Sequence, residues 1–282
     1  MKALVFGSSG LVGQEVLKDL EAQNIPVHAV RRLAPGVKGT TRWFTHDLLH
    51  GAGSTELWDG VTHVFVLAPA GYMNQDQIII PVVEKAKSQK VQKIVLMTAM
   101  GANHAFGSPL QKAEVALQQS ELDWAIIRPN WFMQNFHTYW GHALRTEHTV
   151  AVPAGTAKTS FIDVRDIGAV AAKLLTTKTI GAFDITGPDA LTHAEVAAIL
   201  SEALGQRIRY VDAEPKAFQE GLQKGGFPAD YAAFLMLILG ALREGHAAGV
   251  TTHVEQILQR NPLSFADYAR DFTTHLRTAA KP

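Results

Sequence analysis

Short apolar runs alternate with amphipathic stretches along the first half of the chain. Each run is too hydrophobic along its length for one side to face water, which is typical of parallel strands covered on both faces. We expect strands at Ala3–Phe6, Val27–Val30, Val61–Leu67, Lys93–Thr98 and Trp124–Ile127. Helical periodicity separates them at Leu11–Ala22, Gln75–Ser88 and Gln111–Ser120. The pattern predicts an α/β fold with a doubly wound parallel sheet, Rossmann-like in its order.

Pro81 interrupts the second helical stretch. A proline inside a helix removes a backbone hydrogen bond and costs about 3 kcal/mol unless it falls in the first turn. We therefore expect the regular helix to begin close to Pro81.

The rhythm changes after Pro129, where an aromatic and histidine-rich stretch, 131–148, leads into an extended segment at Thr159–Val164. Thr192 and Glu195 have the spacing of a capping box, and Gly205 suits the end of the helix that they open. We expect helices at Asp166–Leu175, Thr192–Leu204, much of Ala213–Gly249, and Ser264–Leu276. The sequence thus predicts a sheet domain at 1–130, to which a segment at about 159–186 returns, and a smaller, mainly helical region at 131–282.

Composition narrows the classes of protein and partner. Hydrophobic residues make up 47% of the 282 residues, which excludes disorder. Twenty-six basic residues balance 26 acidic ones, so no net charge attracts nucleic acid or a membrane surface. We expect the partner to be a small molecule or a second copy of the chain, in a homodimer. The absence of cysteine excludes disulfides and thiolate metal sites. The first residues form too short an apolar run for a signal peptide, and we expect a cytoplasmic protein.

Three glycines follow the first strand and open the first helix. Gly7 would permit a tight turn, Gly10 would let backbone N–H groups approach a pyrophosphate, and Gly13 would let the helix lie close to the sheet. In this strand–turn–helix context the spacing indicates dinucleotide binding rather than a structural turn. The predicted cofactor-binding residues of this loop are Gly7, Ser8, Ser9, Gly10, Leu11 and Val12.

Arg31 and Arg32 end the second strand, where an NAD-binding chain would place an acidic residue against the ribose 2′-hydroxyl. Two guanidinium groups would instead bind a 2′-phosphate through charge-assisted hydrogen bonds. The sequence therefore predicts NADPH as cofactor, although the same two residues would also suit an ordinary solvated surface.

Several further motifs together resemble the NmrA-like, or atypical, short-chain dehydrogenase/reductase family, especially its NADPH-dependent quinone reductases and triphenylmethane-dye reductases. The resemblance covers nearly the whole chain. Its markers are the Gly7–Gly13 loop, His46-Asp47, Leu67-Ala68-Pro69, the strand end at Thr98, Ile127–Asn135 and Phe161–Gly168.

That resemblance implies roles for particular residues. Asp47 would meet the adenine, and Ala68 and Pro69 would form a wall beside the ribose and the nicotinamide. Leu67 and Thr98, at neighbouring strand ends, join the expected cofactor-binding residues. Phe132 and Asn135 would border the nicotinamide pocket, and the Asp163–Asp166 segment would link the two regions structurally.

The wider superfamily uses Tyr-x-x-x-Lys, in which a lysine lowers the pKa of a proton-exchanging tyrosine. In this chain Ser108 stands at the tyrosine position and Lys112 fills the lysine position. Lys112 would stabilise negative charge on an acceptor oxygen, or it is a surface lysine near Glu114. Tyr72 would cover the nicotinamide or merely pack.

Other candidates carry less chemistry. His46 and His50 lie at a strand end and turn rather than on one helix face, so we expect no metal. Trp131, Phe136 and Tyr139 would form an aromatic face on a helix with Trp140, either for core packing or for stacking a planar substrate. The apolar run Phe234–Leu239 would close the second core or a dimer contact.

The sequence thus favours an NADPH-dependent reductase of quinones that needs no flavin, with a substrate region after Pro129. A quinone gains driving force from its own aromatisation, which suits a site without the tyrosine. The alternative is a redox sensor that binds NADP(H) without turnover. A sugar-nucleotide epimerase is disfavoured because the tyrosine is absent.

Overall fold

The computed structural model describes residues 1–32 and 37–277. Their contacts divide the chain into two compact units. The first contains Met1–Pro129, Val164–Ile185 and Gln256–Gln259, and the second contains Asn130–Asp163, Thr186–Glu255 and the chain from Arg260 onward. Within the described ranges, no helix has both the length and the apolar character needed to cross a membrane.

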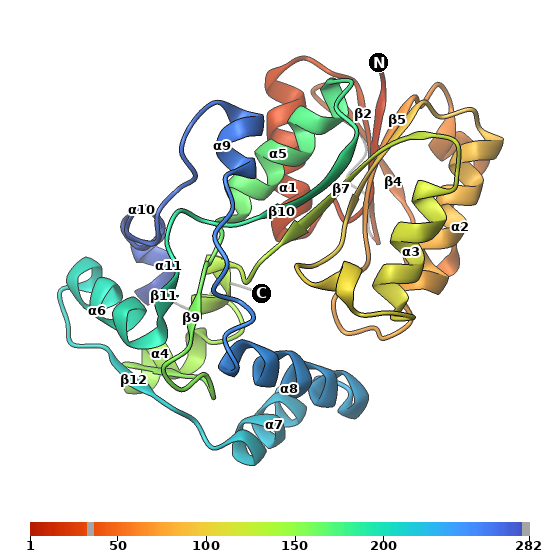
Figure 1. Ribbon diagram of the computed structural model, residues 1–282. Coiled ribbons are helices and arrows are strands. Elements are labelled where there is room, and N and C mark those ends of the chain that lie inside the picture. Colours follow the sequence, from red (N-terminus) through yellow and green to blue (C-terminus); the bar gives the residue numbers. More distant parts are fainter. Residues whose placement is uncertain (33–36, 278–282) are drawn as a thin grey trace. The chain divides into compact units, whose positions relative to one another are not determined.

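The first unit is built on one sheet with the strand order β10-β7-β6-β5-β1-β2-β4-β3 (Figure 1). Seven strands run parallel, and the two-residue β3 pairs antiparallel with β4 at the edge. The order reverses beside β1, which lies between β2 and β5. The strands are β1 (Ala3–Val5), β2 (Val27–Arg31), β3 (Val37–Lys38), β4 (Thr41–Thr45), β5 (His63–Leu67), β6 (Lys93–Met97), β7 (Asp123–Pro129) and β10 (Gly181–Ile185). The predicted doubly wound parallel sheet is confirmed, including all five expected strands.

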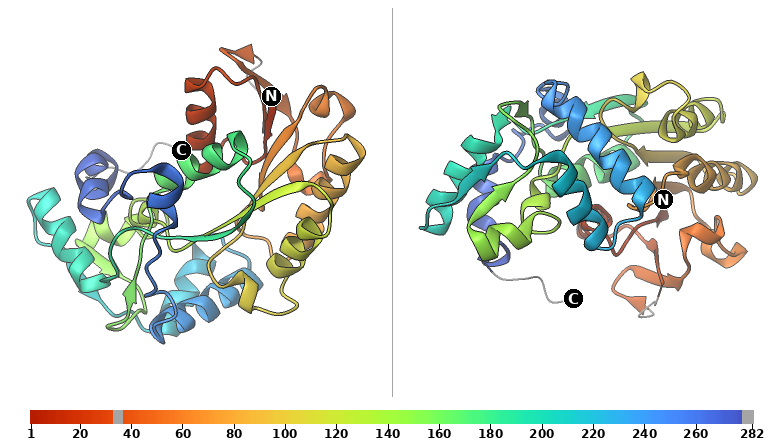
Figure 2. Two further views of the ribbon diagram at one scale, coloured as in Figure 1. Left: turned by 45° about the horizontal axis from the view of Figure 1, so that its top comes forward. Right: turned by 90° about the horizontal axis from the view of Figure 1, so that it is seen from below.

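Helices cover both faces of this sheet, as Figure 2 also shows. On one face α1 (Leu11–Ala22) packs against α5 (Val164–Thr176), and on the other α2 (Gln75–Ser88) packs against α3 (Pro109–Gln118). Gly168 on α5 lies so close to α1 that a Cβ there would stand 2.4 Å from the Cβ of Glu15. Short 3₁₀ turns complete the unit: η1 (Leu48–His50), η2 (Thr55–Trp58) and η3 (Ala102–His104).

Pro81 does not begin its helix, and the expectation that it would is wrong. Helix α2 starts at Gln75 and runs through the proline. Pro81 and Gln77 are both exposed, so water reaches the Gln77 carbonyl that lacks a helical donor. Ile78 and Ile79 on the opposite side are buried in the core, and this burial offsets the lost hydrogen bond.

The second unit consists of helices with small two-stranded sheets. β8 (Thr149–Ala151) pairs with β12 (Arg209–Val211), and β9 (Lys158–Thr159) pairs with β11 (Leu191–Thr192). Helix α6 begins with the predicted capping box at Thr192 and ends at Gly205, whose φ is +63°. The helical elements of this unit are η4 (Met133–Phe136), α4 (Gly141–Glu147), α6 (His193–Leu204), α7 (Pro215–Lys224), α8 (Ala229–Arg243), α10 (Phe265–Asp271) and α11 (Thr273–Arg277). A further helix, α9 (His253–Leu258), crosses the boundary between the units.

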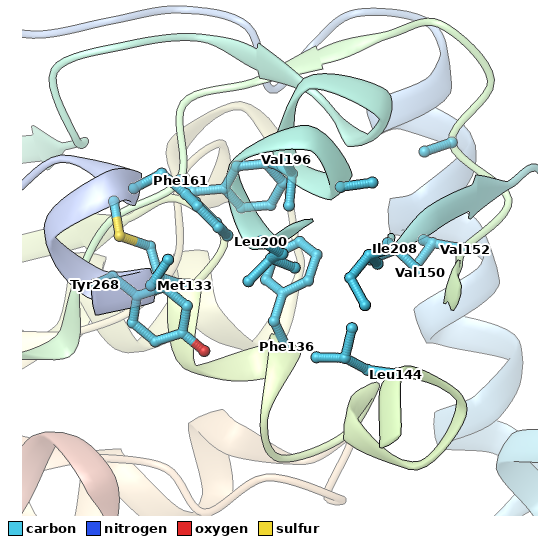
Figure 3. Close-up of a cluster of buried hydrophobic side chains, with 14 of the residues drawn as sticks. Met133, Phe136, Leu144, Val150, Val152, Phe161, Val196, Leu200, Ile208 and Tyr268 are labelled. Atoms are coloured by element: carbon cyan, nitrogen blue, oxygen red, sulfur yellow. The ribbon is translucent and has the colours of Figure 1, made fainter. Parts of the chain in front are cut away.

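Phe136 lies at the centre of the second core (Figure 3), with the rings of Phe161 and Phe265 edge-on at 5.3 and 5.1 Å between centroids. The expected aromatic helix face is wrong, because the chain forms the 3₁₀ turn η4 and then a turn in which Trp140 N–H donates to the Asn135 carbonyl. Phe136 is buried, whereas Tyr139 is 56% exposed. Trp131, Phe136 and Trp140 nevertheless pack together in this core, as the core-packing alternative predicts, and Tyr139 is not among them.

Three other expectations for this unit change in detail. The extended segment at Thr159–Val164 shrinks to the end of β9 and a single bridge at Ile162, because Val164 already begins α5. The last helix is divided at Phe272 into α10 and α11. In the apolar run on α8 only Leu239 is buried, and Leu237 is 71% exposed.

Candidate dinucleotide-binding site

The loop between β1 and α1 requires glycine at two positions. Gly7 has a φ of +71°, a conformation that L side chains rarely adopt, and a Cβ there would also lie 3.3 Å from the Leu67 side chain. Gly13 faces back onto the loop, where a Cβ would stand 2.1 Å from the Gly7 carbonyl oxygen. The predicted tight turn at Gly7 is therefore present, and Gly13 lets α1 approach the loop itself.

The N-terminus of α1 is open. Gly10 is its N-cap and supplies no side-chain cap, so the first-turn N–H groups keep their hydrogen-bonding capacity. A Cβ on Gly10 would approach only the Gly7 oxygen, at 3.3 Å, and Ser9 and Leu11 are also exposed. Uncapped N–H groups and the positive end of the helix dipole are what a pyrophosphate requires, so these residues fit a dinucleotide.

Ser8 has a different task from its neighbours. Its buried hydroxyl donates to the Val5 carbonyl and accepts a hydrogen bond from the Val30 N–H at 3.1 Å. The side chain of Ser8 thereby ties the glycine loop to β2 immediately before Arg31. Only its main chain remains for the predicted contact with the cofactor, and Val12, which is also buried, has the same restriction.

Arg31 and Arg32 follow at the carboxyl end of β2, and both are exposed. The Arg31 carbonyl accepts a hydrogen bond from the His46 N–H at 3.1 Å, which brings the start of the next loop alongside. Asp47 in that loop caps η1 by accepting the Leu49 N–H at 3.1 Å. No acidic residue stands at the end of β2 itself.

One of the two histidines of this loop, His46, already has a partner within the protein. His46 Nε2 lies 2.7 Å from the Gly51 carbonyl oxygen, a hydrogen bond that occupies the ring nitrogen. Among the residues that the structure describes, no group of three potential ligands could hold a metal ion.

The ends of β5 and β6 supply the next predicted residues. Leu67 at the end of β5 lies against Gly7, which follows β1. The ends of β1 and β5 therefore meet where the strand order reverses, which is the usual ligand crevice of such sheets. Ala68 and Pro69 continue from Leu67 and are partly exposed, and Tyr72 beyond them is 39% exposed.

Thr98 is buried, and its hydroxyl donates to Glu114 at 2.6 Å. That hydroxyl hydrogen therefore serves the protein interior and not an incoming ligand.

Ser108 and Lys112 begin α3. The Ser108 hydroxyl caps the helix by accepting the Gln111 N–H at 3.3 Å, which is a structural use of the residue at the superfamily's tyrosine position. The Lys112 ammonium lies 4.0 Å from Asp76 in the first turn of α2, with its side chain 56% exposed. Its acidic neighbour is thus Asp76 and not Glu114. An exposed pair at this distance contributes about 1 kcal/mol or less, so the ammonium is available to another partner.

A buried ion pair that the sequence did not suggest anchors α3 to the sheet. Glu114 is 2% exposed and accepts hydrogen bonds from Arg128 Nε and Nη2 at 2.9 and 2.6 Å. Asp184 on β10 lies 3.5 Å from the same guanidinium. Burial would lower the pKa of Arg128, but the hydrogen bonds and charge of Glu114 outweigh it, and the pKa is raised. The charged network holds the helix that carries Lys112 in a fixed place on the sheet.

Phe132 and Asn135 belong to the second unit and lie at either end of one turn. Phe132 forms a bridge with Ile162, and its carbonyl accepts the Asn135 N–H at 3.2 Å. Nearby, Gln134 donates to Asp163 at 2.9 Å, and both of these side chains are buried. The residues that the structure brings together around the glycine loop therefore all belong to the first unit. Arg31 lies next to the Ser8–Val30 hydrogen bond, and Leu67 lies against Gly7.

The fold and this loop define a dinucleotide-binding protein of the Rossmann-like class. A family model described as NAD(P)H-binding matches residues 7–178, and the chain belongs to that family. The predicted membership of the NmrA-like proteins is confirmed, and the coarser class of the activity is that of an NAD(P)H-dependent oxidoreductase.

Similar proteins support this classification. The chain is 31% identical to an NAD(P)H azoreductase of Xenophilus azovorans, over 95% of this chain and 96% of that protein. A triphenylmethane reductase of Citrobacter has a similar structure, with a TM-score of 0.79 and 16% identity over 96% of this chain and 100% of that one. An NADPH-dependent quinone oxidoreductase of Escherichia coli, complexed with NADPH, gives the same TM-score at 17% identity, over 96% and 99% of the two chains. At such identities the two structures show a shared fold.

Proposed function

We propose that this protein is an NADPH-dependent reductase that transfers hydride directly to a quinone or a similarly planar conjugated acceptor. Three of the similar proteins are named for the reduction of azo compounds, triphenylmethane dyes or quinones, all of which are conjugated acceptors. The observation that carries the proposal for the acceptor is the role of Ser108. Its hydroxyl caps α3, so the position that would hold a proton-exchanging phenol holds a helix cap instead.

The preference for NADPH over NADH is supported by charge. Arg31 and Arg32 are both exposed at the end of β2, where a 2′-phosphate attached to the adenosine ribose would lie if the pyrophosphate binds at Gly10. A guanidinium donates paired hydrogen bonds to phosphate oxygens, and a carboxylate at this position would repel them.

Within this proposal the residues of the first unit bind the cofactor and stabilise negative charge on the acceptor. The N–H groups at Leu11 and Val12 hold the pyrophosphate, since the Gly10 N–H donates to the Gly7 carbonyl at 2.9 Å. Leu67, Ala68 and Pro69 line the way from β5 toward the nicotinamide. Bound NADPH supplies a hydride, which with one proton from solvent converts a quinone into a hydroquinone. Lys112 stabilises the negative charge on the acceptor oxygen until that proton arrives. Tyr72 of the first unit and, in the second unit, Phe132 and Asn135 are the residues that we expect to orient the acceptor.

Reduction of a quinone does not require a strong proton donor on the protein. Reduction makes the ring aromatic, which lowers the need for a group of tuned pKa such as the tyrosine that this chain lacks. The chain's main contribution is then to hold the acceptor against the nicotinamide and to exclude competing orientations.

NADPH consumption measured against a panel of quinones and cationic dyes, with no added flavin, tests the proposal. We expect steady consumption with simple quinones and one hydroquinone formed for each NADPH. Tight NADPH binding without turnover across the whole panel would overturn it and would favour an NADP(H)-binding regulator. Omission of each acceptor in turn controls for direct oxidation by air.

A further inference from the structure

We propose that Trp43 is a positioning residue for cofactor choice, because its ring holds the Arg31 guanidinium ready for the 2′-phosphate of NADPH. The inference rests on the proposed function in that it takes Arg31 as a phosphate-binding residue. It adds a side chain on the next strand that touches no part of the cofactor and still affects which cofactor binds.

The register of two parallel strands creates the contact. Ala29 on β2 pairs with Trp43 on β4, and Arg31 pairs with Thr45. Because side chains alternate across a strand, Trp43 lies on the same face of the sheet as Arg31 and two positions before its partner. The Arg31 guanidinium carbon consequently lies 5.7 Å from the centroid of the Trp43 ring, within the range of a cation–π interaction.

A contact through the face of the guanidinium leaves the arginine's N–H donors available. A guanidinium stacks through its face, whereas its N–H donors point outward in its plane toward any phosphate oxygens. Arg31 is exposed, and an exposed arginine loses much rotational freedom when it binds a phosphate. A ring that already restricts the side chain reduces that loss. Its backbone is fixed as well, through the Ser8 bond to Val30 and the His46 bond to the Arg31 carbonyl.

The effect should distinguish the two cofactors. NADPH carries the 2′-phosphate, and NADH carries a hydroxyl there that gains nothing from a prepared guanidinium. A cation–π contact at an exposed site changes an equilibrium constant by about two- to fivefold. Trp43 should therefore contribute about that factor to the NADPH-to-NADH affinity ratio and leave NADH affinity unchanged.

The same strand offers a matched control. Arg42 lies over the Phe44 ring at 4.8 Å, on the opposite face of the sheet from Trp43. Phe44 also contacts His28 at 4.8 Å between ring centroids and packs against the first core. Loss of this second ring should weaken the fold at least as much as loss of Trp43, but it should not alter the cofactor ratio.

Isothermal titration of NADPH and NADH into Trp43→Leu, Phe44→Leu and wild-type protein tests the inference, with thermal melts to confirm folding. We expect Trp43→Leu to lower the affinity ratio by about two- to fivefold, Trp43→Phe to restore part of it, and Phe44→Leu to leave it unchanged. An unchanged ratio in Trp43→Leu, or equal weakening of both cofactors, would overturn the inference. Equal weakening would mean that the ring touches the adenosine or supports only the fold.

A second background separates this inference from the proposed cofactor choice. In Arg31→Ala protein, Trp43→Leu should cause no further change in the ratio, because the residue through which it acts is gone. The same two- to fivefold change in both backgrounds would overturn the positioning role. If Arg31→Ala and Arg32→Ala together leave the NADPH preference intact, the assignment of these arginines to the 2′-phosphate fails instead.

Discussion

His193, the first residue of α6, makes the stability of the second unit sensitive to acid. The ring is fully buried, with the rings of Phe161 and Tyr210 at 5.4 and 5.7 Å between centroids. Neither ring nitrogen has a hydrogen-bond partner within the described part of the chain. Burial lowers the pKa of His193 to about 4 against an opposing effect of Asp212, and the N-terminus of a helix also disfavours a cation.

The sign of the pH effect follows from which state takes up the proton. Above pH 6.5 the ring is neutral whether the chain is folded or unfolded. As the pH falls from 6.5 toward 4, the unfolded chain binds a proton and the folded chain does not, so stability is lost across this window. At pH 5 the loss attributable to His193 is about 2 kcal/mol relative to pH 8.

His137 contributes in the same direction. Burial, followed by the positive charges of His275 and Arg145, lowers its pKa to about 4. It remains in a His193 variant, so that variant should keep part of the acid sensitivity.

Urea unfolding at pH 8 and pH 5, followed by tryptophan fluorescence, measures the effect in His193→Phe, which keeps an aromatic ring and removes the titrating group. The variant should lose about 2 kcal/mol less stability than wild type between the two pH values. His142→Phe, at an exposed position on α4, should behave as wild type. Equal losses in His193→Phe and wild type would refute the reasoning.

Three further variants test the dinucleotide site and the proposed chemistry. Arg31→Ala with Arg32→Ala should weaken NADPH binding at least tenfold, about 1.4 kcal/mol, with little change for NADH, by isothermal titration. Gly10→Val should fold normally by circular dichroism, because only the Gly7 oxygen lies near the added Cβ, at 3.3 Å, yet lose most NADPH affinity; normal binding would remove the loop from the site. Lys112→Ala should lower kcat roughly 10²-fold with nearly unchanged NADPH affinity, and full activity would reduce it to a surface residue.

Local patterns predicted the parts of this chain in which neighbouring residues determine the structure. The glycine loop, α1 and the capped ends of α6 follow from turn, period and capping chemistry within a few residues of each other. The same kind of argument gave a wrong helix start at Pro81. The hydrogen bond that the proline removes is offset by burial of Ile78 and Ile79 against segments distant in sequence, which local patterns do not show.

For the candidate site, the sequence predicted which residues lie at the strand ends, but it did not predict the hydrogen bonds that their side chains make. The sequence placed Ser8 and Thr98 beside the cofactor, but their hydroxyls bond to β2 and Glu114, as only the assembled sheet reveals. The Glu114–Arg128 pair and the Trp43 ring under Arg31 likewise depend on strand register. A pattern of hydrophobic and polar positions predicts the kind of sheet, but it does not predict which residues of two neighbouring strands lie side by side.

The interrupted path of the chain sets an order in which the sheet can be completed during synthesis. The nucleotide loop is complete within the first 13 residues, but β10 ends only at Ile185 and α5 comes just before it. Until α5 is made, α1 lacks its partner helix. Until β10 is made, β7 pairs only with β6 and remains an edge strand, the kind of surface on which partly made chains aggregate. A ribosome-bound chain that stops after Pro129 therefore presents a dinucleotide loop on an unfinished sheet, and chaperone contact should persist until about 185 residues have emerged.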